Sequence, residues 1–293
     1  MSILEERVRL RAMVRGAYDL QKLRMMTGAR LCAAFKAKLG AVAGESEEEL
    51  EENAQKVLAV LRQSFIRLSD GVARNRTIPT REKFKGDEII SEYSEIVLMS
   101  QYLELEGVEK RQFSQLENSL CEFPIYTTWL RDVVGVGPAM AAVCIAEIDI
   151  HKAKYPSSLW RYAGLDVAAD GVGRSRRKEH LVDTEYTNKD GEVLSKKSIT
   201  YNPFLKTKLA GVLTGCFLRS KSPYAAIYNG YKHRLQNTPE KAEWTKMHIH
   251  NAAKRYMIKM FLLDLHREWR KVEGYPASVP YHEAKLGIRH AAE

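Results

Sequence analysis

A turn with the sequence Gly135-Val136-Gly137-Pro138 separates two apolar segments of this chain. Glycine allows backbone conformations with positive φ, and proline suits the first turn of a helix, so the sequence predicts two helices joined by a tight hairpin. Glycines also leave backbone N–H groups uncovered, and the start of the second helix presents free N–H groups and a partial positive charge. This pattern is typical of a helix-hairpin-helix, which would hold a nucleic-acid backbone without reading its bases. The alternative is a tight turn inside a helical bundle.

The composition favours a folded protein with a polyanionic partner. The 293 residues carry a net charge of +9, and 45% of them are hydrophobic, which argues against disorder and for nucleic acid as a partner. The four cysteines are scattered without a metal-ligand spacing, which indicates reduced, buried thiols. No apolar segment is long enough to cross a membrane, and the first residues lack the apolar core of a signal peptide. We therefore expect a soluble, intracellular protein.

The first part of the chain, residues 1–122, has the pattern of long helices. Apolar residues recur at helical spacing over residues 3–39, among many arginines and lysines, with interruptions expected near Gly16 and Gly28. The basic face of this segment is either solvated or in contact with nucleic acid. After a break at 40–44, an acidic run at 45–52 starts a second helix. A basic loop at 70–87 and a third helix over 88–120 follow, so we expect a helical hairpin or a coiled-coil arm.

The second part, residues 123–275, is expected to form a helical domain with one small β-hairpin. The helix-hairpin-helix covers residues 125–147, and Ser157 is predicted to cap the next helix. Residues 182–195 alternate in polarity around the sequence Asn-Lys-Asp-Gly, which predicts two strands joined by a turn.

Two later helices have recognisable starts, because Asn202-Pro203 and Ser222-Pro223 each combine a capping side chain with a first-turn proline. A last long helix is predicted over residues 246–273, and an irregular tail over 276–293. The predicted fold class is therefore mainly α, with long helices first and a helix-hairpin-helix domain second.

A glycine-rich loop, Asp170-Gly-Val-Gly173, leads into the basic sequence Arg174-Ser175-Arg176-Arg177-Lys178. The glycines would let basic side chains lie close to a duplex, where each neutralised phosphate steepens the salt dependence of binding. Ser175 either donates a hydrogen bond to a phosphate or acts as the nucleophile of phosphoryl transfer, with the arginines stabilising the developing charge. We assign DNA contacts to Gly135, Val136, Gly137, Pro138, Arg174, Arg176, Arg177, Lys178, Lys206 and Lys208.

Histidines and tyrosines near the C-terminus allow further interpretations. Three histidines lie close together in the sequence: His248, His250 and His266. They have no complete set of partner ligands, so we expect no metal site and assign them to the surface or to phosphate contacts. Three tyrosines share one helix face: Tyr224, Tyr228 and Tyr231. Such a stripe belongs to a core, with base stacking as the alternative.

Several segments taken together resemble the C-terminal transposase domain of the insertion-sequence-110 family. They are residues 135–148 with the glycine hairpin, residues 155–165 (Tyr-Pro-Ser-Ser-Leu-Trp-Arg-Tyr-Ala-Gly-Leu), the basic glycine loop, and residues 201–205 (Tyr-Asn-Pro-Phe-Leu). Their order and spacing match over residues 130–218. The helices that follow, up to residue 273, are also similar, so that the resemblance covers about half of the chain.

The resemblance implies DNA recombination by a serine-containing transposase domain, which in this family acts with an RNase H-like domain of four acidic residues. Some members are guided by a structured RNA. The first half of this chain reads as helices, and the four acidic residues have no counterpart in it. The serine of the family lies in a Ser-Gly-Gly-Lys-like loop, whereas the first serine after the corresponding loop here is Ser175.

The resemblance implies the function and the partners that we expect, and a place in the prokaryotic cytoplasm, associated with the nucleoid. We expect a self-associating, transposase-like protein that binds DNA, with a guide RNA as a further partner and Mg²⁺ as the cofactor of any strand cleavage. One alternative is a transposase relative that binds nucleic acid without catalysis, and another is that RNA is the main ligand, because contacts to a backbone discriminate poorly between nucleic acids.

Overall fold

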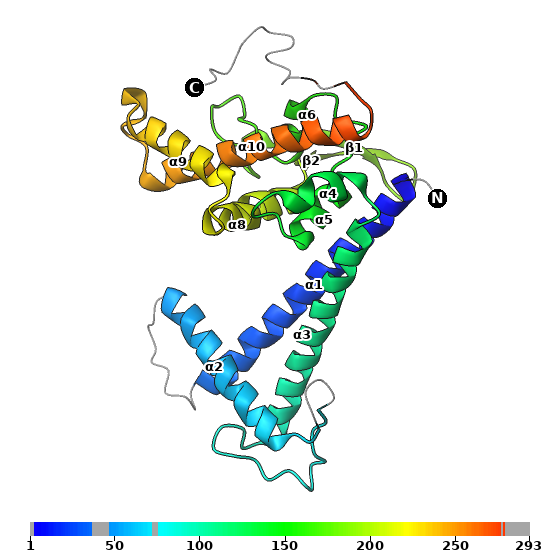
Figure 1. Cartoon of the computed structure of the whole chain (residues 1–293), viewed down its shortest axis with the longest axis vertical. Coiled ribbons are helices and arrows are strands. Elements are labelled where there is room, and N and C mark those ends of the chain that lie inside the picture. The colour runs from blue at the N-terminus through cyan, green and yellow to red at the C-terminus, as the bar shows by residue number, and fades with distance from the viewer. Residues whose placement is uncertain (1–2, 37–46, 72–75, 277, 279–293) are drawn as a thin grey trace. The chain divides into compact units, whose positions relative to one another are not determined.

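The computed structural model describes residues 3–36, 47–71, 76–276 and 278 of the chain. The fold is mainly α with one small antiparallel hairpin of strands, which confirms the predicted fold class (Figure 1). Internal contacts divide the chain into unit 1, Met1–Arg11 with Leu116–Glu293, and unit 2, Ala12–Gln115. The predicted break at 40–44 and nearly all of the predicted tail, 276–293, lie outside the described residues.

The grouping of residues differs from the sequence-based division at 122/123, because the start of the chain belongs to unit 1. Arg7 donates hydrogen bonds to the carbonyl oxygen of Ile148 at 2.6 Å and to Asp149 at 2.9 Å. Arg11 forms an ion pair with Glu147 at 3.3 Å. These contacts join the first turns of the first helix to the end of the helix that follows the glycine hairpin.

Unit 2 is built from three helices: α1 (Ile3–Lys36), α2 (Glu47–Leu68) and α3 (Tyr93–Leu120), of which α1 and α3 also contribute residues to unit 1. Its core combines residues of all three helices with one residue of the α2–α3 loop: Leu31, Cys32, Phe35, Val57, Leu61, Phe65, Ile90, Ile96, Met99 and Tyr102. Burial of this apolar surface holds the three helices together.

The predicted interruptions of the first helix near Gly16 and Gly28 are wrong, because α1 is continuous. A glycine inside a helix costs only about 1 kcal/mol relative to alanine, which packing can outweigh. At Gly28 the missing side chain is used: a Cβ there would lie 2.9 Å from the ring of Tyr102 on α3. The glycine therefore allows a close approach of two helices instead of ending one.

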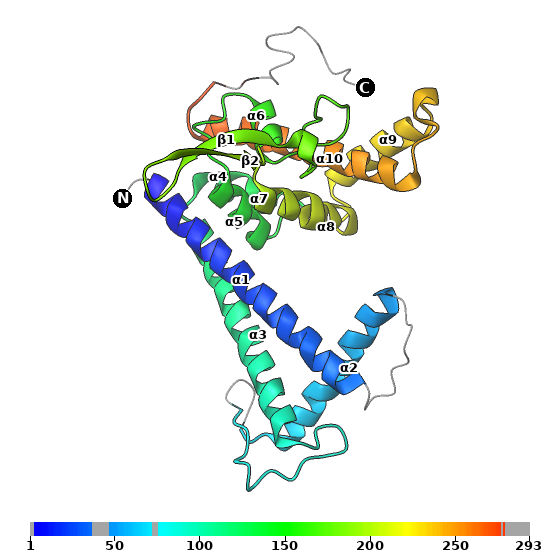
Figure 2. The same ribbon diagram turned by 180° about the vertical axis from the view of Figure 1, so that it is seen from behind.

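Unit 1 is a bundle of short helices around one long helix, α10 (Lys246–Val272). The other elements are α4 (Pro124–Thr128), the 3₁₀ turn Leu130–Asp132, α5 (Pro138–Glu147), α6 (Pro156–Tyr162), the 3₁₀ turn Lys178–His180, α7 (Pro203–Lys206), the π-helix Thr207–Leu213, α8 (Thr214–Arg219), α9 (Pro223–Gln236) and the 3₁₀ turn Pro239–Lys241. α10 packs against α4, α6, α8 and α9, and its pairing with α9 is visible from both sides (Figures 1 and 2).

Local capping signals account for several of these helix starts. Asn202 accepts a hydrogen bond from the N–H of Leu205 at 3.1 Å, and Ser222 accepts one from the N–H of Tyr224 at 3.4 Å, as predicted. The predicted cap at Ser157 is wrong, because α6 already begins at Pro156. Tyr155 takes the cap position there, and Pro156 provides the first turn without needing a side-chain cap.

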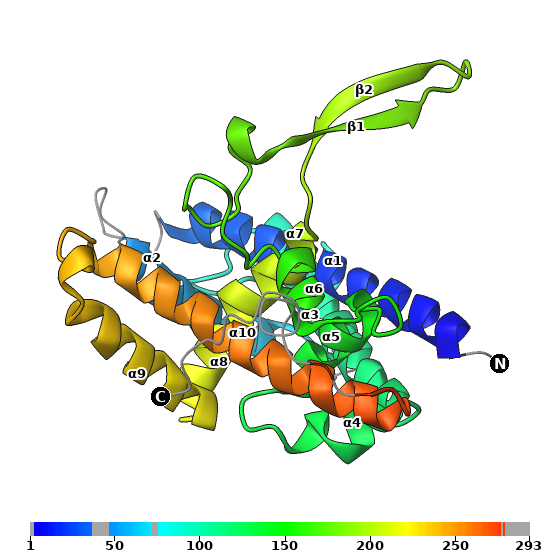
Figure 3. The ribbon, with the colours of Figure 1, turned by 90° about the horizontal axis from the view of Figure 1, so that it is seen from above.

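The predicted hairpin of strands is present as β1 (Val182–Thr187) and β2 (Val193–Ser198), paired antiparallel from Val182↔Ser198 to Thr187↔Val193. In Figure 3 it stands apart from the helices of unit 1, and nearly all of its residues are exposed. In the part of the chain that the structure describes, no helix combines the length and the apolar character needed to span a bilayer.

All four cysteines are free, but their burial differs from the prediction: Cys32 and Cys144 are buried, whereas Cys121 is exposed and Cys216 is half-buried. Burial raises the pKa of the Cys144 thiol to about 12. This thiol therefore stays protonated and behaves as a small apolar side chain.

Candidate nucleic-acid interface

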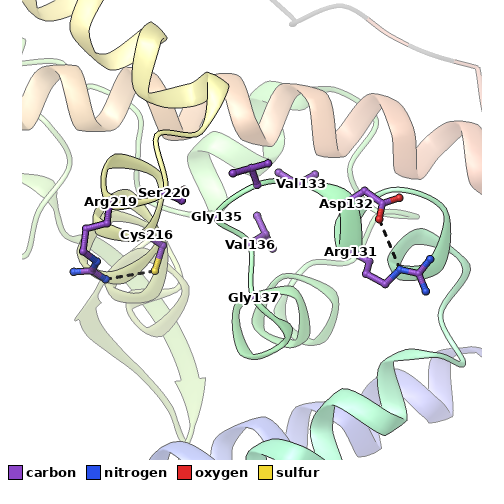
Figure 4. A pocket seen from close by; sticks show the side chains of 10 residues that line it. Arg131, Asp132, Val133, Gly135, Val136, Gly137, Cys216, Arg219 and Ser220 are labelled. Carbon is purple, nitrogen blue, oxygen red and sulfur yellow. Dashed lines mark hydrogen bonds and ion pairs between the residues drawn. The ribbon is translucent and has the colours of Figure 1, made fainter.

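The glycine hairpin forms at the predicted place, and its two glycines have different roles (Figure 4). Gly135 has φ of 95°, and a Cβ there would lie 2.7 Å from Phe217 and 2.8 Å from the hydroxyl of Ser220, so that only glycine fits. Gly137 has an ordinary φ of −79°, and a Cβ there would meet nothing within 4 Å. The first glycine is required by the fold, and the second leaves space open in front of the turn.

The second helix of the hairpin begins at Pro138 as predicted, whereas the first is shorter than predicted and broken between α4 and a 3₁₀ turn. The backbone N–H groups of Gly135, Gly137 and Ala139 have no acceptor among the described residues. Such uncovered donors at a helix start suit an anion.

A shallow cavity of about 660 Å³ lies against this turn. Arg131 precedes the turn and Arg219 comes from α8, and Figure 4 shows the two arginines on opposite sides of the glycines. An anion in the cavity would meet backbone N–H groups and two guanidinium groups. The one carboxylate in the lining is Asp132, which lies 3.8 Å from Arg131.

The basic loop is closed by its own arginine and held against α10 by an arginine of that helix. Arg174 donates to the Asp166 carboxylate at 2.7 Å. Arg255 of α10 donates to the carbonyl oxygens of Asp166 and Leu165, at 2.6 and 3.2 Å. A Cβ at Gly173 would lie 1.3 Å from the Arg255 guanidinium, so the arginine can occupy this position only because residue 173 is a glycine.

Four cations gather around Asp166: Arg174, Lys206, Arg255 and Lys259, which we call the cationic cluster. Lys206 donates a hydrogen bond to the carbonyl oxygen of Arg174. Burial lowers the pKa of Lys206 and of Lys259, and the nearby charge of Arg255 lowers both further. Burial also lowers the pKa of the Arg255 guanidinium. The cluster therefore holds more positive charge than its one carboxylate balances, a condition that an added anion would relieve.

Of the residues assigned to DNA contacts, Val136 of the hairpin is buried, and the six basic residues fall into three groups. Arg176, Arg177 and Lys178 are exposed and can reach a ligand. Arg174 and Lys206 are half-buried and hold the loop as well as carrying charge.

The third group is Lys208, which lies apart in the π-helix. Its ammonium group is 5.5 Å from the centroid of the Phe204 ring, and burial lowers its pKa.

Ser175 is hydrogen-bonded to a histidine that is in turn bonded to a carboxylate. Its Oγ lies 3.0 Å from Nδ1 of His180, and Nε2 of His180 lies 2.9 Å from Oδ2 of Asp170. The Ser175 backbone N–H also donates to Nδ1, at 2.9 Å. Nδ1 is therefore the acceptor, and Nε2 carries the ring proton and donates a hydrogen bond to Asp170.

This arrangement has the order of a nucleophile, a base and an orienting carboxylate. His180 is buried, whereas Asp170 is exposed. The hydrogen bond from His180 lowers the pKa of the Asp170 carboxyl, with a further contribution from the N–H of Val172. The same contacts also hold the loop closed, since the backbone of Ser175 shares the acceptor with its hydroxyl.

Sequence reasoning identified Ser175 but missed His180, Asp170, Arg255 and Lys259. One signal could have found the last two: residues 193–263 contain thirteen lysines and arginines but only two acidic residues, Glu240 and Glu243. The excess positive charge of the chain is concentrated in this segment, which includes most of α10. His180 had no comparable signal, because a single histidine five residues from a serine is common.

The residues around Ser175 do not fit an Mg²⁺ site, which would need several oxygen ligands. Asp166 is paired with Arg174 and Asp170 with His180, and the cationic cluster lies beside them. Within the described ranges, no group of three or more histidine, cysteine or acidic side chains is placed to hold a metal ion.

The three histidines near the C-terminus have separate surroundings. His248 is exposed and stacks on Trp244, with ring centroids 3.9 Å apart. His250 is half-buried and bonds to the hydroxyl of Tyr228 at 2.6 Å. His266 is fully buried and bonds to the carbonyl oxygen of Ala153 at 2.8 Å, so its assignment to the surface is wrong. Burial lowers the pKa of His250 and of His266.

The three tyrosines of the stripe differ in burial. Tyr224 and Tyr228 are buried, as a core stripe predicts, and Tyr224 donates to Asp264 at 2.9 Å. Tyr231 is only half-buried and stacks on Tyr256 of α10.

Comparisons of this chain with protein-family models, with curated proteins and with solved structures find no match.

Proposed function

We propose that the protein binds DNA and acts as a transposase-like recombinase, with unit 1 holding the phosphate backbone. The observation that supports this most directly is the cationic cluster, which lies beside a hydrogen-bonded serine and has one carboxylate for four cations. Phosphate is the anion that such a cluster would bind on a polymer, and Arg176, Arg177 and Lys178 extend the positive surface from the same loop. The glycine hairpin supplies a second place for a phosphate, through backbone N–H groups.

In the catalytic form of the proposal, Ser175 attacks a backbone phosphate. Its Oγ would form a bond to phosphorus while the bond from phosphorus to the departing ester oxygen breaks. The hydroxyl proton passes to Nδ1 of His180 and then to the departing oxygen, while Asp170 stabilises the charged imidazole. The nearby guanidinium and ammonium groups stabilise the negative charge on the phosphoryl oxygens. Reversal of the step on a new strand end would rejoin the DNA.

A covalent serine–DNA adduct is the test of this step. Labelled DNA that carries the sequences flanking the gene is incubated with the protein and run on a denaturing gel. The wild type is expected to form a protein–DNA band, and Ser175→Ala to form none. Ser195→Ala, which removes an exposed hydroxyl on β2, is the matched control and should behave as the wild type. An adduct that survives in Ser175→Ala would remove Ser175 from the mechanism.

The second candidate function is binding without catalysis. It is favoured by the hydrogen bond from the Ser175 N–H to His180, which gives the histidine a purely structural use. Reproducible strand-exchange products from the wild-type protein would exclude this candidate. Their absence, with DNA binding intact, would support it.

The hairpin offers a separate test of backbone binding. Gly137→Ala adds a methyl group in open space and is expected to change the melting temperature little. It should weaken duplex binding, because the methyl group would cover the turn at which we propose that a phosphate binds. Gly135→Ala is expected to lower the melting temperature instead, because the residue has a positive φ and close neighbours. Equal duplex affinity for Gly137→Ala and the wild type would contradict phosphate binding at this turn.

Self-association and a structured guide RNA complete the proposal. Nucleic acid that copurifies with the protein, treated separately with DNase and RNase, distinguishes DNA from RNA as the bound polymer. Light scattering with and without the bound nucleic acid measures the oligomeric state.

A further inference from the structure

A cavity of about 800 Å³ lies in unit 1 between α9 and α10. Its lining residues do not include any from the loop of Ser175. Its lining combines aromatic, cationic and small residues, among them Gly230, Tyr231 and Arg234 of α9 and Tyr256 of α10. Asn237 and Thr238, just beyond α9, add polar groups at one end. The cavity therefore offers flat aromatic surface together with hydrogen-bonding groups.

The two tyrosines form a parallel stack. The ring centroids of Tyr231 and Tyr256 are 4.1 Å apart and their planes differ by 13°. The guanidinium carbon of Arg234 lies 4.8 Å from the first centroid and 5.9 Å from the second. With the rings this close together, those distances place the guanidinium beside the stack and not on its outer face. Both rings are half-buried, so part of their surface is accessible at the cavity.

The charge around this cavity is positive. α9 contains no acidic residue, and the first one in α10 is Asp264. Lys232, His233 and Arg234 lie on α9, so a ligand that carries phosphates would meet no nearby carboxylate from either helix before Asp264. Aromatic rings beside a basic surface are the combination by which proteins bind unpaired bases, since every base has a flat π-face.

We propose that this cavity binds an unpaired base of single-stranded nucleic acid by stacking it against the Tyr231–Tyr256 pair. Arg255, the neighbour of Tyr256 on α10, belongs to the cationic cluster, so one helix would contact a backbone phosphate at one position and a base at the next. This inference rests on the proposed function, since it adds a place for the single strands that recombination exposes.

Gly230 provides a variant that closes the cavity without disturbing the core. It is exposed on α9, and a Cβ at this position would meet nothing within 4 Å. Gly230→Leu therefore places a side chain in the cavity, and replacing a helical glycine favours the helix. Asn229→Leu is the matched control, because Asn229 is the exposed neighbour on the same helix and does not line the cavity.

The experiment measures binding of a 12-nucleotide DNA strand with a central 2-aminopurine, and of the duplex of the same sequence, to the full-length protein and both variants. The wild type is expected to quench the 2-aminopurine fluorescence of the single strand. Gly230→Leu is expected to bind the single strand about 10-fold more weakly while duplex affinity stays within about twofold. Asn229→Leu should match the wild type in both.

Three outcomes would overturn the inference. Equal single-strand affinity of Gly230→Leu and the wild type, or a wild type that binds the duplex but not the single strand, would remove the base site and leave the proposed function in place. A wild type that binds neither polymer would overturn the proposed function together with the base site.

Discussion

In unit 2 the half-buried arginines Arg24 and Arg62 each face a carboxylate of their own, whereas in the cationic cluster of unit 1 four cations share one. Arg24 donates to Glu109, and Arg62 forms a two-pronged pair with Glu106 at 2.9 and 3.1 Å. In both cases the hydrogen bond to the carboxylate raises the pKa of the arginine, against the effect of burial. In the cationic cluster of unit 1, burial and neighbouring cations lower the pKa of Lys206 and Lys259.

The difference indicates that the half-buried charges of the two units have different roles. A charge that is taken partly out of water needs a partner, or it lowers the stability of the fold. Unit 2 supplies the partners from its own helices, so its charges serve the structure of the unit. The cationic cluster of unit 1 has too few carboxylates, which costs stability, and we expect it to be retained because an external anion completes it, as we propose. Four experiments test whether the charges of the two units differ in this way.

The largest effect is expected from Glu109→Gln in unit 2. Glu109 is buried and accepts hydrogen bonds from both Arg24 and Gln21, the latter at 3.1 Å. Its neutralisation leaves the Arg24 charge without a partner, so the free energy of unfolding should fall by about 3 kcal/mol. Urea unfolding measures this loss. A double variant, Arg24→Met with Glu109→Leu, should recover most of it, and a single variant as stable as the wild type would contradict the pairing argument.

Bound DNA should stabilise unit 1 selectively. A duplex present at 100 times its dissociation constant raises the free energy of unfolding by about 2.7 kcal/mol if it binds only the folded state. Hydrogen exchange should slow in residues 166–180 and in α10, since these carry the cationic cluster, and should be unchanged in α2. Equal protection of α2 and α10 would show that the charges of the two units do not differ in this way.

Asp87 tests the pairing in unit 2 by its pH dependence. Burial would raise the pKa of its carboxyl, but hydrogen bonds from the N–H groups of Ile90 and Ile89, from Ser64 and from Arg67 outweigh burial and lower the pKa to about 2. A lowered pKa contributes stability that is present above the ordinary pKa of an aspartate and is lost as the pH falls toward 2. Asp87→Asn should therefore cost about 1 to 2 kcal/mol at neutral pH.

The same variant should show a weaker loss of stability between pH 5 and pH 3 than the wild type. Urea unfolding at several pH values gives both curves. Parallel curves for the two proteins would mean that Asp87 does not contribute to the acid sensitivity of unit 2.

The smallest effect on stability is expected for Lys259→Met in unit 1. This change removes a half-buried cation from a cluster with too few carboxylates and keeps the length of the side chain, so the free energy of unfolding should change by less than about 0.5 kcal/mol. Duplex binding should weaken, and the slope of its dependence on salt concentration should fall by about 1. Lys271→Met, at the exposed end of the same helix, is the control. Loss of stability without loss of binding would reverse the roles given to the two units.

Much of the local structure could be predicted because its causes are close together in the sequence. The starts at Asn202-Pro203 and Ser222-Pro223, the hairpin of strands and the beginning of α5 at Pro138 all depend on residues within one turn of each other. The errors at Gly28 and Ser157 arose where this locality fails. Gly28 is required by the ring of Tyr102, which lies far along the chain, and α6 begins at a proline that makes the serine cap unnecessary.

The candidate site was predicted only in part for the same reason. The basic sequence around Ser175 is contiguous and visible. Its partners are not: Arg255 and Lys259 come from a helix about 80 residues later, and the role of His180 depends on a loop that folds back to Asp170. Hydrogen-bond distances decide these roles, and spacing along the chain does not specify them.

The mainly helical class, the glycine hairpin, most helix starts and the excess of positive charge can be predicted from the residues alone, because they follow from backbone preferences and composition. The folded chain is needed to see which cations gather around Asp166, which glycine of the hairpin is required, and that Ser175 bonds to His180. Packing of distant segments sets those neighbours. It also distinguishes a charge that is paired within the fold, as Arg24 is by Glu109, from the charges of the cationic cluster, which share one carboxylate.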